Sequence, residues 1–137
     1  MRAVVLDNEA VQSLLEPRHR KHRLALAHLE AVTTRRRKGA EVTALVPTSV
    51  RVEAGWDRTV PAAAAINRFR ISDVPLDTRH ADAAAAIARA HPDVEVVDSH
   101  LGAAVQAHAA TEIVVLTSDA TDIRRVVDPR NVTIVRV

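Results

Sequence analysis

The sequence predicts an α/β domain of three layers, in which helices cover both faces of a mostly parallel sheet of about five strands. The first observation is the length, because 137 residues form one domain with a sizeable core. The second is the composition: 47% of the residues are hydrophobic, which is typical of a globular chain. The third is the order of elements, since short apolar runs alternate with helical patterns. We therefore expect a single domain over residues 1–137, with right-handed crossovers between its strands.

The first half of the chain is expected to hold three strands and four helices. Pro17 and Gly39 mark where the first two helices end, because proline stops a helix and glycine suits the residue after one. Pro47 and Pro61 mark where the next two begin, since a fixed φ suits a first helical turn. In chain order we expect a strand over 1–6, helices over 8–15 and 18–38, a strand over 42–46, helices over 48–56 and 62–69, and a strand over 70–74.

The second half is expected to alternate helices with strands. Asp77 or Thr78 caps the first of these helices, and Pro92 closes it. The run Val94-Glu95-Val96-Val97 is apolar but short; it is predicted as a strand, with Asp98 as the cap of the helix after it. In chain order we expect a helix over 79–90, a strand over 94–97, a helix over 99–109, a strand over 112–116, a helix over 119–126 and a strand over 132–137.

The composition excludes several classes of protein. The chain has no cysteine, so it has neither disulfides nor thiolate metal sites, which fits a reducing cytosol. No apolar run approaches the roughly 18–20 residues of a membrane span, and no signal-peptide pattern is seen. We therefore expect a cytoplasmic protein with no membrane partner. Trp56 and Phe69 are the only residues of the Phe, Trp and Tyr types, so the chain has almost no aromatic side chains on which nucleic-acid bases could stack.

Three apolar runs lead into an aspartate, and these aspartates are Asp7, Asp98 and Asp119. Active sites of parallel α/β sheets lie outside the carboxyl ends of the strands, so side chains placed there converge. Two unit charges about 4 Å apart repel by about 4 kcal/mol at an effective dielectric near 20. Such a cluster holds a divalent cation, or its carboxyl groups have raised pKa values. The pattern therefore indicates a metal site.

Glu53 is a further candidate, within a predicted helix. It lies one step from the helical stripe of Val46, Val50 and Ala54, close to the strand end from which Asp7 emerges. The alternative is a plain surface glutamate. Alternatives exist for the aspartates as well, because each can serve only as a helix cap, with Asp119 and Asp122 as an N-cap and N3 pair. What favours function is that all of these positions fall on one edge of one sheet.

At this point the residues resemble a known family, the PIN-domain ribonucleases, and most closely the VapC-type toxins of bacterial type II toxin–antitoxin systems. The resemblance covers Met1 to Val137. It rests on the order, the spacing and the total length rather than on any single motif. The matching segments are Val4-Val5-Leu6-Asp7, Pro47-Thr48-Ser49-Val50-Arg51-Val52-Glu53, Val96-Val97-Asp98-Ser99-His100-Leu101-Gly102-Ala103 and Leu116-Thr117-Ser118-Asp119-Ala120-Thr121-Asp122-Ile123.

The resemblance implies a PIN-like fold and a role for each matching acid. Asp7, Glu53 and Asp98 correspond to three acids that hold Mg²⁺ or Mn²⁺, and Asp119 corresponds to a fourth. Asp122 is also acidic in many members, so Asp119 and Asp122 are both candidates for the fourth position. Thr117 or Ser118 is expected to hydrogen-bond a ligand carboxylate.

The implied activity is a metal-dependent endoribonuclease that hydrolyses RNA phosphodiester bonds, with one or two metal ions. The implied partners are an RNA substrate, a cognate antitoxin and a second copy of the chain. A PIN-like module that binds RNA or protein without catalysis is the alternative. Two other α/β folds are excluded because residues that they require are missing. A receiver domain needs a lysine at the end of a late strand, whereas the last lysine of this chain is Lys38. A dinucleotide-binding domain needs a glycine-rich loop, whereas this chain has only three glycines, far apart in the sequence.

Two basic clusters are candidates for contacts with RNA phosphates. The residues are Arg18, Arg20 and Arg23 in the first cluster and Arg35, Arg36 and Arg37 in the second. Blocks of this kind bind phosphates in many proteins. The alternative is a solvated helix face.

Overall fold

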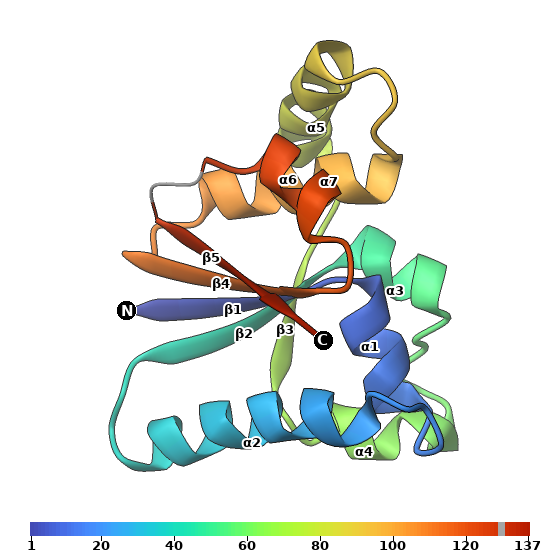
Figure 1. The fold of residues 1–137 in the computed structure, drawn as a ribbon, viewed down its shortest axis with the longest axis vertical. Helices are drawn as coiled ribbons and strands as arrows, with labels where there is room; N and C mark the ends of the chain where they lie inside the picture. Colours follow the sequence, from blue (N-terminus) through green and yellow to red (C-terminus); the bar gives the residue numbers. More distant parts are fainter. Residues whose placement is uncertain (129–130) are drawn as a thin grey trace.

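The strands form one all-parallel, five-stranded sheet with the order β3-β2-β1-β4-β5 (Figure 1). The computed structural model describes residues 1–128 and 131–137. The chain adds β2 and β3 on one side of β1 and then returns to add β4 and β5 on the other. The strand order therefore reverses between β1 and β4, and a crevice for ligands is expected at the carboxyl ends of these two strands. The strands are β1 (Arg2–Leu6), β2 (Val42–Pro47), β3 (Ile71–Val74), β4 (Glu112–Thr117) and β5 (Val132–Arg136).

Helices connect each strand to the next, as parallel pairing requires. A 3₁₀ turn, η1, covers Pro61–Ala63 and leads directly into α4. Within the described residues, none of the helices has the length and apolar character needed to cross a membrane. The α-helices are α1 (Asn8–Leu15), α2 (His22–Arg37), α3 (Thr48–Ala54), α4 (Ala64–Asn67), α5 (Thr78–Ala90), α6 (Val96–Ala107) and α7 (Ala120–Val126).

The two faces of the sheet pack against separate groups of helices. Because successive side chains of a strand point to opposite faces, Val4 and Leu6 of β1 join the core under α1, α2, α3 and α4. Ala3 and Val5 of the same strand join the core under α5, α6 and α7. Figure 1 shows α2 and α4 below the sheet and α5, α6 and α7 above it. The predicted three-layer α/β/α arrangement with a parallel sheet is confirmed.

One predicted strand is wrong, because residues 94–97 add no strand to the sheet. Glu95 is the N-cap of α6, and the helix begins at Val96. Asp98 therefore lies in the first turn of α6 and does not cap a helix over 99–109. The hydrophobic spacing explains the error. Val97, Leu101 and Val105 repeat every four residues and bury one helix face, whereas the short run alone resembles strand alternation.

Other boundaries differ by smaller amounts. The helix predicted over 18–38 begins at His22, because Arg18 to Lys21 form turns that are closed by the backbone bonds His19 N to Glu16 O and His22 N to His19 O. The helix predicted over 62–69 is only η1 followed by α4. It ends before Arg70, whose φ of 52° is left-handed and turns the chain into β3.

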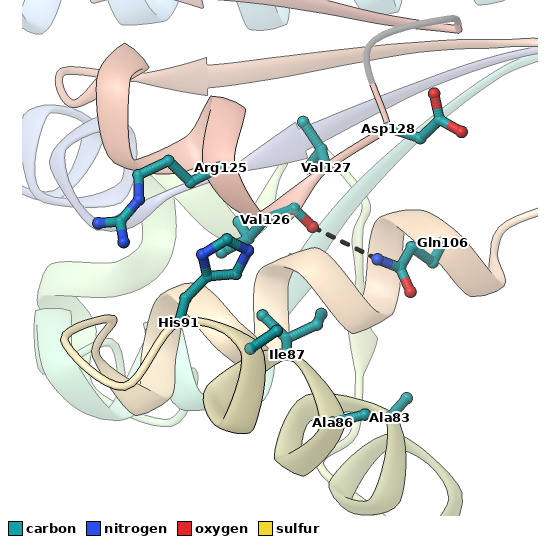
Figure 2. A pocket seen from close by; sticks show the side chains of 10 residues that line it. Ala83, Ala86, Ile87, His91, Gln106, Arg125, Val126, Val127 and Asp128 are labelled. Atoms are coloured by element: carbon teal, nitrogen blue, oxygen red, sulfur yellow. Dashed lines mark hydrogen bonds between the residues drawn. The ribbon is translucent and has the colours of Figure 1, made fainter.

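The contact between α6 and α7 is close enough to require glycine. A Cβ atom at Gly102 would lie 2.6 Å from the carbonyl oxygen of Val126 and 3.0 Å from Cδ1 of Ile87. The Gln106 side chain, one turn further along α6, donates to the same Val126 carbonyl at 3.4 Å. Figure 2 shows Ile87, Gln106 and Val126 facing one another across the three helices. Gly102 therefore determines how closely α7 packs against α6. Because α7 begins directly after Asp119, this packing also positions Asp119.

We predict that Gly102→Ala destabilises the protein by about 1–3 kcal/mol, because a carbonyl of the backbone cannot move as a side chain does. In a helix without this contact, a glycine-to-alanine substitution stabilises the protein by up to about 1 kcal/mol. The sign of the change in the free energy of unfolding therefore tests the close contact. Urea unfolding followed by circular dichroism measures it. A gain in the free energy of unfolding would contradict the close contact.

Candidate metal centre

Asp7 lies at the switch point between β1 and β4 and is held there by three neighbours. Its backbone N–H donates to Leu116 O at 3.0 Å, which continues the β1–β4 pairing. Its Oδ1 accepts from Asn8 N at 2.8 Å, so it also caps α1. Its Oδ2 accepts from the hydroxyl of Thr117 at 2.7 Å. Asp7 is 7% exposed, and these hydrogen bonds fix the orientation of its carboxylate.

The end of β4 brings a second group of acids beside Asp7. The Thr117 hydroxyl, which is fully buried, accepts from Asp119 N at 3.0 Å and so ties the next turn to Asp7. Asp119 is the N-cap of α7, and its Oδ1 accepts from Asp122 N at 3.3 Å. Asp122 is also 3.8 Å from the guanidinium of Arg125. Ser118 is exposed.

The amino end of α6 supplies two acids, of which the sequence analysis found only one. Asp98 is half-buried, and Glu95 is an exposed N-cap residue three positions earlier. Residues three apart lie on one face of a helix, so the pair points the same way. The predicted strand over 94–97 places Glu95 and Asp98 on different elements, so their helical spacing of three residues is not seen from the sequence. The repeat of Val97, Leu101 and Val105 is the signal that places Glu95 and Asp98 on a helix.

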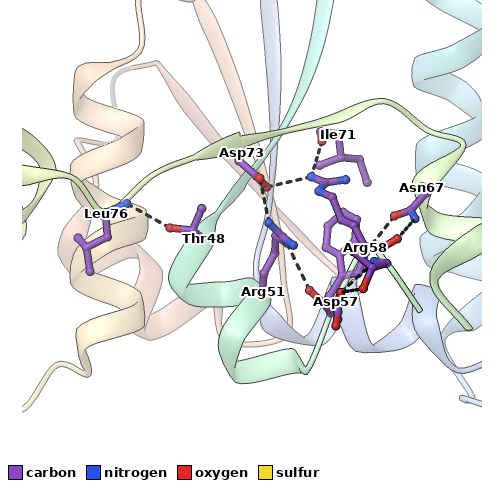
Figure 3. A network of polar contacts seen from close by, with 10 residues as sticks. Thr48, Arg51, Asp57, Arg58, Asn67, Ile71, Asp73 and Leu76 are labelled. Atoms are coloured by element: carbon purple, nitrogen blue, oxygen red, sulfur yellow. Dashed lines mark hydrogen bonds and ion pairs between the residues drawn. The ribbon is translucent and has the colours of Figure 1, made fainter. Parts of the chain in front are cut away.

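Glu53 is on α3, and a polar network holds this helix against β3. Arg51 donates to Asp73 at 2.9 Å, and Arg58 donates to the other oxygen of Asp73 at 2.9 Å. Thr48 accepts from the backbone of Leu76 at 3.1 Å. Figure 3 shows both guanidinium groups converging on Asp73. The helix that carries Glu53 is therefore fixed relative to the sheet edge.

A hydrogen-bonded pair, Ser49 and His100, links α3 to α6. Ser49 Oγ lies 2.7 Å from Nδ1 of His100, whose side chain is completely buried. Within the described part of the chain, no hydrogen bond is found for the other ring nitrogen of His100, which is buried. Ser49 is one helical turn before Glu53, and His100 is two residues after Asp98. The pair thus sets the distance between the two helices that carry these acids.

The acids interact electrostatically across these elements. Burial first, and then repulsion from Asp7, Asp122, Asp119 and Glu95, together raise the pKa of Asp98 to about 7. Burial also raises the pKa of Asp7, against the lowering effect of its hydrogen bonds to Thr117 and Asn8. The pKa of Glu53 is raised by burial and then by repulsion from Glu95 and Asp7. The candidates from distant segments therefore share one electrostatic field.

The donor chemistry of this cluster fits a hard divalent cation. Every candidate ligand is a carboxylate oxygen, and Mg²⁺ and Mn²⁺ prefer such ligands. Within residues 1–128 and 131–137, no three Asp, Glu or His side chains are arranged to hold a metal ion together. The acids thus share an edge of the sheet without forming a closed ligand set. Their mutual repulsion is a physical reason for the separation.

The arginine clusters lie at the two ends of α2, away from one another. Arg18 and Arg20 are exposed in the turns before α2, and Arg23 is exposed in its first turn. Arg36 is half-buried and donates to the carbonyls of Val42 at 2.9 Å and of Phe69 at 3.0 Å. Val42 is the first residue of β2. Arg35, Arg36 and Arg37 therefore lie at the amino end of the sheet, opposite the acids.

We predict that the metal-free protein loses stability as the pH rises from about 4 to about 7. The folded-state pKa of Asp98 is about 7 against an ordinary value of 3.8, so the folded protein keeps a proton that the unfolded chain loses in this window. Asp98→Asn removes most of this loss and raises the melting temperature at pH 8. Asp93, whose pKa is lowered to about 2 by Arg125, contributes only below this window. Melting curves at pH 5 and pH 8 in EDTA measure the effect; equal pH dependence in both proteins would contradict it.

Comparison with known proteins identifies the fold. No protein-family model matches this sequence. No curated protein matches it either. Among solved structures, the chain is similar to VapBC2 from Rickettsia felis, crystallised bound to a DNA fragment from their promoter. The TM-score is 0.60 at 9% sequence identity, and the match covers 98% of each chain. The likeness extends over the whole length, so the predicted PIN-like α/β fold is confirmed.

Proposed function

We propose that this chain is a Mg²⁺- or Mn²⁺-dependent endoribonuclease and the toxin of a toxin–antitoxin pair. One observation carries the proposal: the Asp98 carboxyl is repelled by Asp7, Asp119, Asp122 and Glu95, which come from three separate parts of the chain. Carboxylates gathered at a switch point form a site for a cation that binds phosphate. The structural likeness to VapBC2, a toxin–antitoxin complex, supports the same assignment at the level of the fold.

The ion would be held by Asp7, Glu53, Asp98 and one of Asp119 and Asp122. Asp7 is the anchor, because Thr117 and Asn8 fix its carboxylate and leave further lone pairs for a ligand. A bound divalent cation supplies an activated water and neutralises charge on the scissile phosphate. Asp98, with a pKa of about 7, is ionised above neutral pH, and its carboxylate would there be available to the ion. Glu95 adds a carboxylate at the rim of the same cluster.

We predict that Asp98→Asn and Glu53→Gln each lower metal-dependent RNA cleavage at least about 100-fold, because each removes an anionic ligand. The matched control is Asp82→Asn, an exposed aspartate on α5, which should cleave like the parent protein. Asp119→Asn and Asp122→Asn rank the two candidates for the fourth position. The readout is cleavage of a labelled RNA with Mg²⁺, with Mn²⁺ and with EDTA.

The outcomes separate the two candidate functions. Full cleavage by a well-folded Asp98→Asn protein would contradict the metal centre. RNA binding without cleavage in either metal would instead support the non-catalytic RNA-binding module.

An antitoxin and a second copy of the chain are the proposed protein partners. A shallow apolar hollow of about 230 Å³ lies between α5 and α6, and the exposed side chains of Leu76 and Val96 border it. Exposed apolar surface of this kind favours a protein partner. The VapBC2 likeness supports an antitoxin as that partner.

We predict that the isolated protein is a dimer at micromolar concentration and that Val96→Asp weakens its binding to a co-expressed antitoxin. Light scattering measures the first and co-purification the second. A strict monomer would contradict the dimer, and unchanged co-purification would contradict the α5–α6 surface.

A further inference from the structure

The face opposite the acidic cluster carries a hollow lined by arginines. Its volume is about 400 Å³, and its lining residues come from the last turns of α2 and from the turn before β3. An adjoining hollow of about 480 Å³ shares four of these residues and adds Glu30 and Thr34. We call the first hollow the arginine pocket; it is lined by Thr33, Arg36, Arg37, Arg68, Phe69 and Arg70.

The charge of this pocket is not balanced within the described residues. Elsewhere arginines pair with carboxylates, as Arg2 does with Glu112 and Arg125 with Asp93. No ion pair is formed by any of the four pocket arginines in the part of the chain that the structure describes. Four positive charges therefore face Glu30, the one acid among the residues that line the two hollows. Such a concentration of guanidinium groups attracts an anion with several oxygens.

The pocket is built rather than a loose surface patch. Arg36 donates through Nε to Val42 O and through Nη1 to Phe69 O, so it joins α2 to β2 and to the turn before β3. The guanidinium is thereby fixed, and Nη2 stays free of these bonds. Arg70 has a φ of 52°, a conformation that glycine or asparagine adopts more readily than arginine. The left-handed turn at Arg70 places this residue beside Arg68 and Phe69 in the lining of the pocket.

Phe69 indicates which polyanion suits the pocket. The chain has two aromatic residues of the Phe, Trp and Tyr types, and Trp56 is only 3% exposed. Phe69 is partly buried, with one side packed against the core under α2 and α4, and the surface that stays accessible lines the arginine pocket. A positive groove with an aromatic ring is the usual arrangement for single-stranded nucleic acid, because a base stacks on the ring while the phosphates contact the arginines. A duplex offers no free base for that ring.

We propose that the arginine pocket binds the phosphodiester backbone of single-stranded RNA, with a base stacked on Phe69. The choice of RNA over single-stranded DNA rests on the proposed function. The pocket lies one strand length, roughly 17 Å, from the acidic edge. It thus holds the RNA at a second point, distant from the bond that is cut. The straight line across this distance runs through the packed sheet, so the RNA follows a longer path around the domain and needs more than roughly five stacked nucleotides, at about 3.4 Å each.

The experiment measures RNA binding apart from cleavage. All variants carry Asp98→Asn and are kept in EDTA, so the RNA is not cut. The probe is a fluorescent single-stranded RNA of about 12 nucleotides, more than the number needed to span the two edges. The pocket pair is Arg37→Ala with Arg68→Ala. The control pair is Arg79→Ala with Arg89→Ala, two exposed arginines of α5, so that both proteins lose the same charge.

We expect the pocket pair to flatten the plot of log affinity against log salt. Each neutralised phosphate contributes about 0.7 to the slope on single strands, so losing two contacts lowers it by roughly 1.4 between about 50 and 200 mM salt. The loss is similar for all sequences, because backbone contacts do not read bases. The control pair keeps the parent slope. Equal slopes for the two pairs would overturn the proposal.

Two further variants exclude a merely structural role. Arg70→Gly is expected to melt at the same or a higher temperature than the parent, since it relieves the positive φ, while it weakens RNA binding. Phe69→Leu keeps an apolar side chain but loses the stacking surface, and is expected to weaken RNA binding at least roughly fivefold. Wild-type RNA affinity in both variants would overturn the proposal.

The remaining outcomes separate this site from other ligands and from the proposed function. A duplex DNA that binds more tightly than the RNA, with the same dependence on Arg37 and Arg68, would overturn the assignment to single strands. Full competition by inorganic phosphate at the affinity of the RNA would show a site for free phosphate and overturn it as well. Cleavage by the wild-type protein with an unchanged slope in the pocket pair rejects this site and keeps the nuclease. A flattened slope without any cleavage keeps this site and rejects the nuclease.

Discussion

The mutual repulsion of carboxylates at one edge of a parallel sheet is the constraint on which the rest of this structure depends. Parallel strands end on the same side, so the acids that follow β1 and β4 are neighbours although more than a hundred residues separate them. Asp7 is buried there, with a hydrogen bond from Thr117 that compensates part of the cost of its charge. Burial, together with repulsion from Asp7, Asp122, Asp119 and Glu95, raises the pKa of Asp98 to about 7. The divalent cation that we propose for this site would relieve this repulsion while the fold is kept.

Residues outside the acidic cluster fix the positions of the helices that carry the acids. The Ser49–His100 pair and the Arg51–Asp73 ion pair hold α3 from two sides. The absence of a Cβ atom at Gly102 allows α7 to approach α6. None of these residues carries a charge into the acidic cluster. They determine instead how far apart its members lie, which decides whether side-chain rotation alone can bring the carboxylates onto one ion.

The sequence contained most of the fold, because parallel strands and amphipathic helices have strong local patterns. The aspartates at the ends of β1 and β4 could be placed without a structure, since a buried apolar run fixes where a strand ends. The region 94–97 could not, because four residues do not distinguish strand alternation from one helical turn. Glu95 was missed for that reason. The Ser49–His100 pair and the arginine pocket were also invisible, since each joins segments that only tertiary packing brings together.

Calorimetric titration of the protein with Mn²⁺ tests the central claim most directly, because it measures the relief of repulsion itself. If the ion displaces the proton of Asp98, binding near pH 6.5 releases protons, and the measured heat depends on the ionisation enthalpy of the buffer. The affinity then rises between pH 6 and pH 8, on either side of a pKa of about 7. Binding with no proton release and no pH dependence, or no binding of Mn²⁺ by the folded protein, would contradict the account.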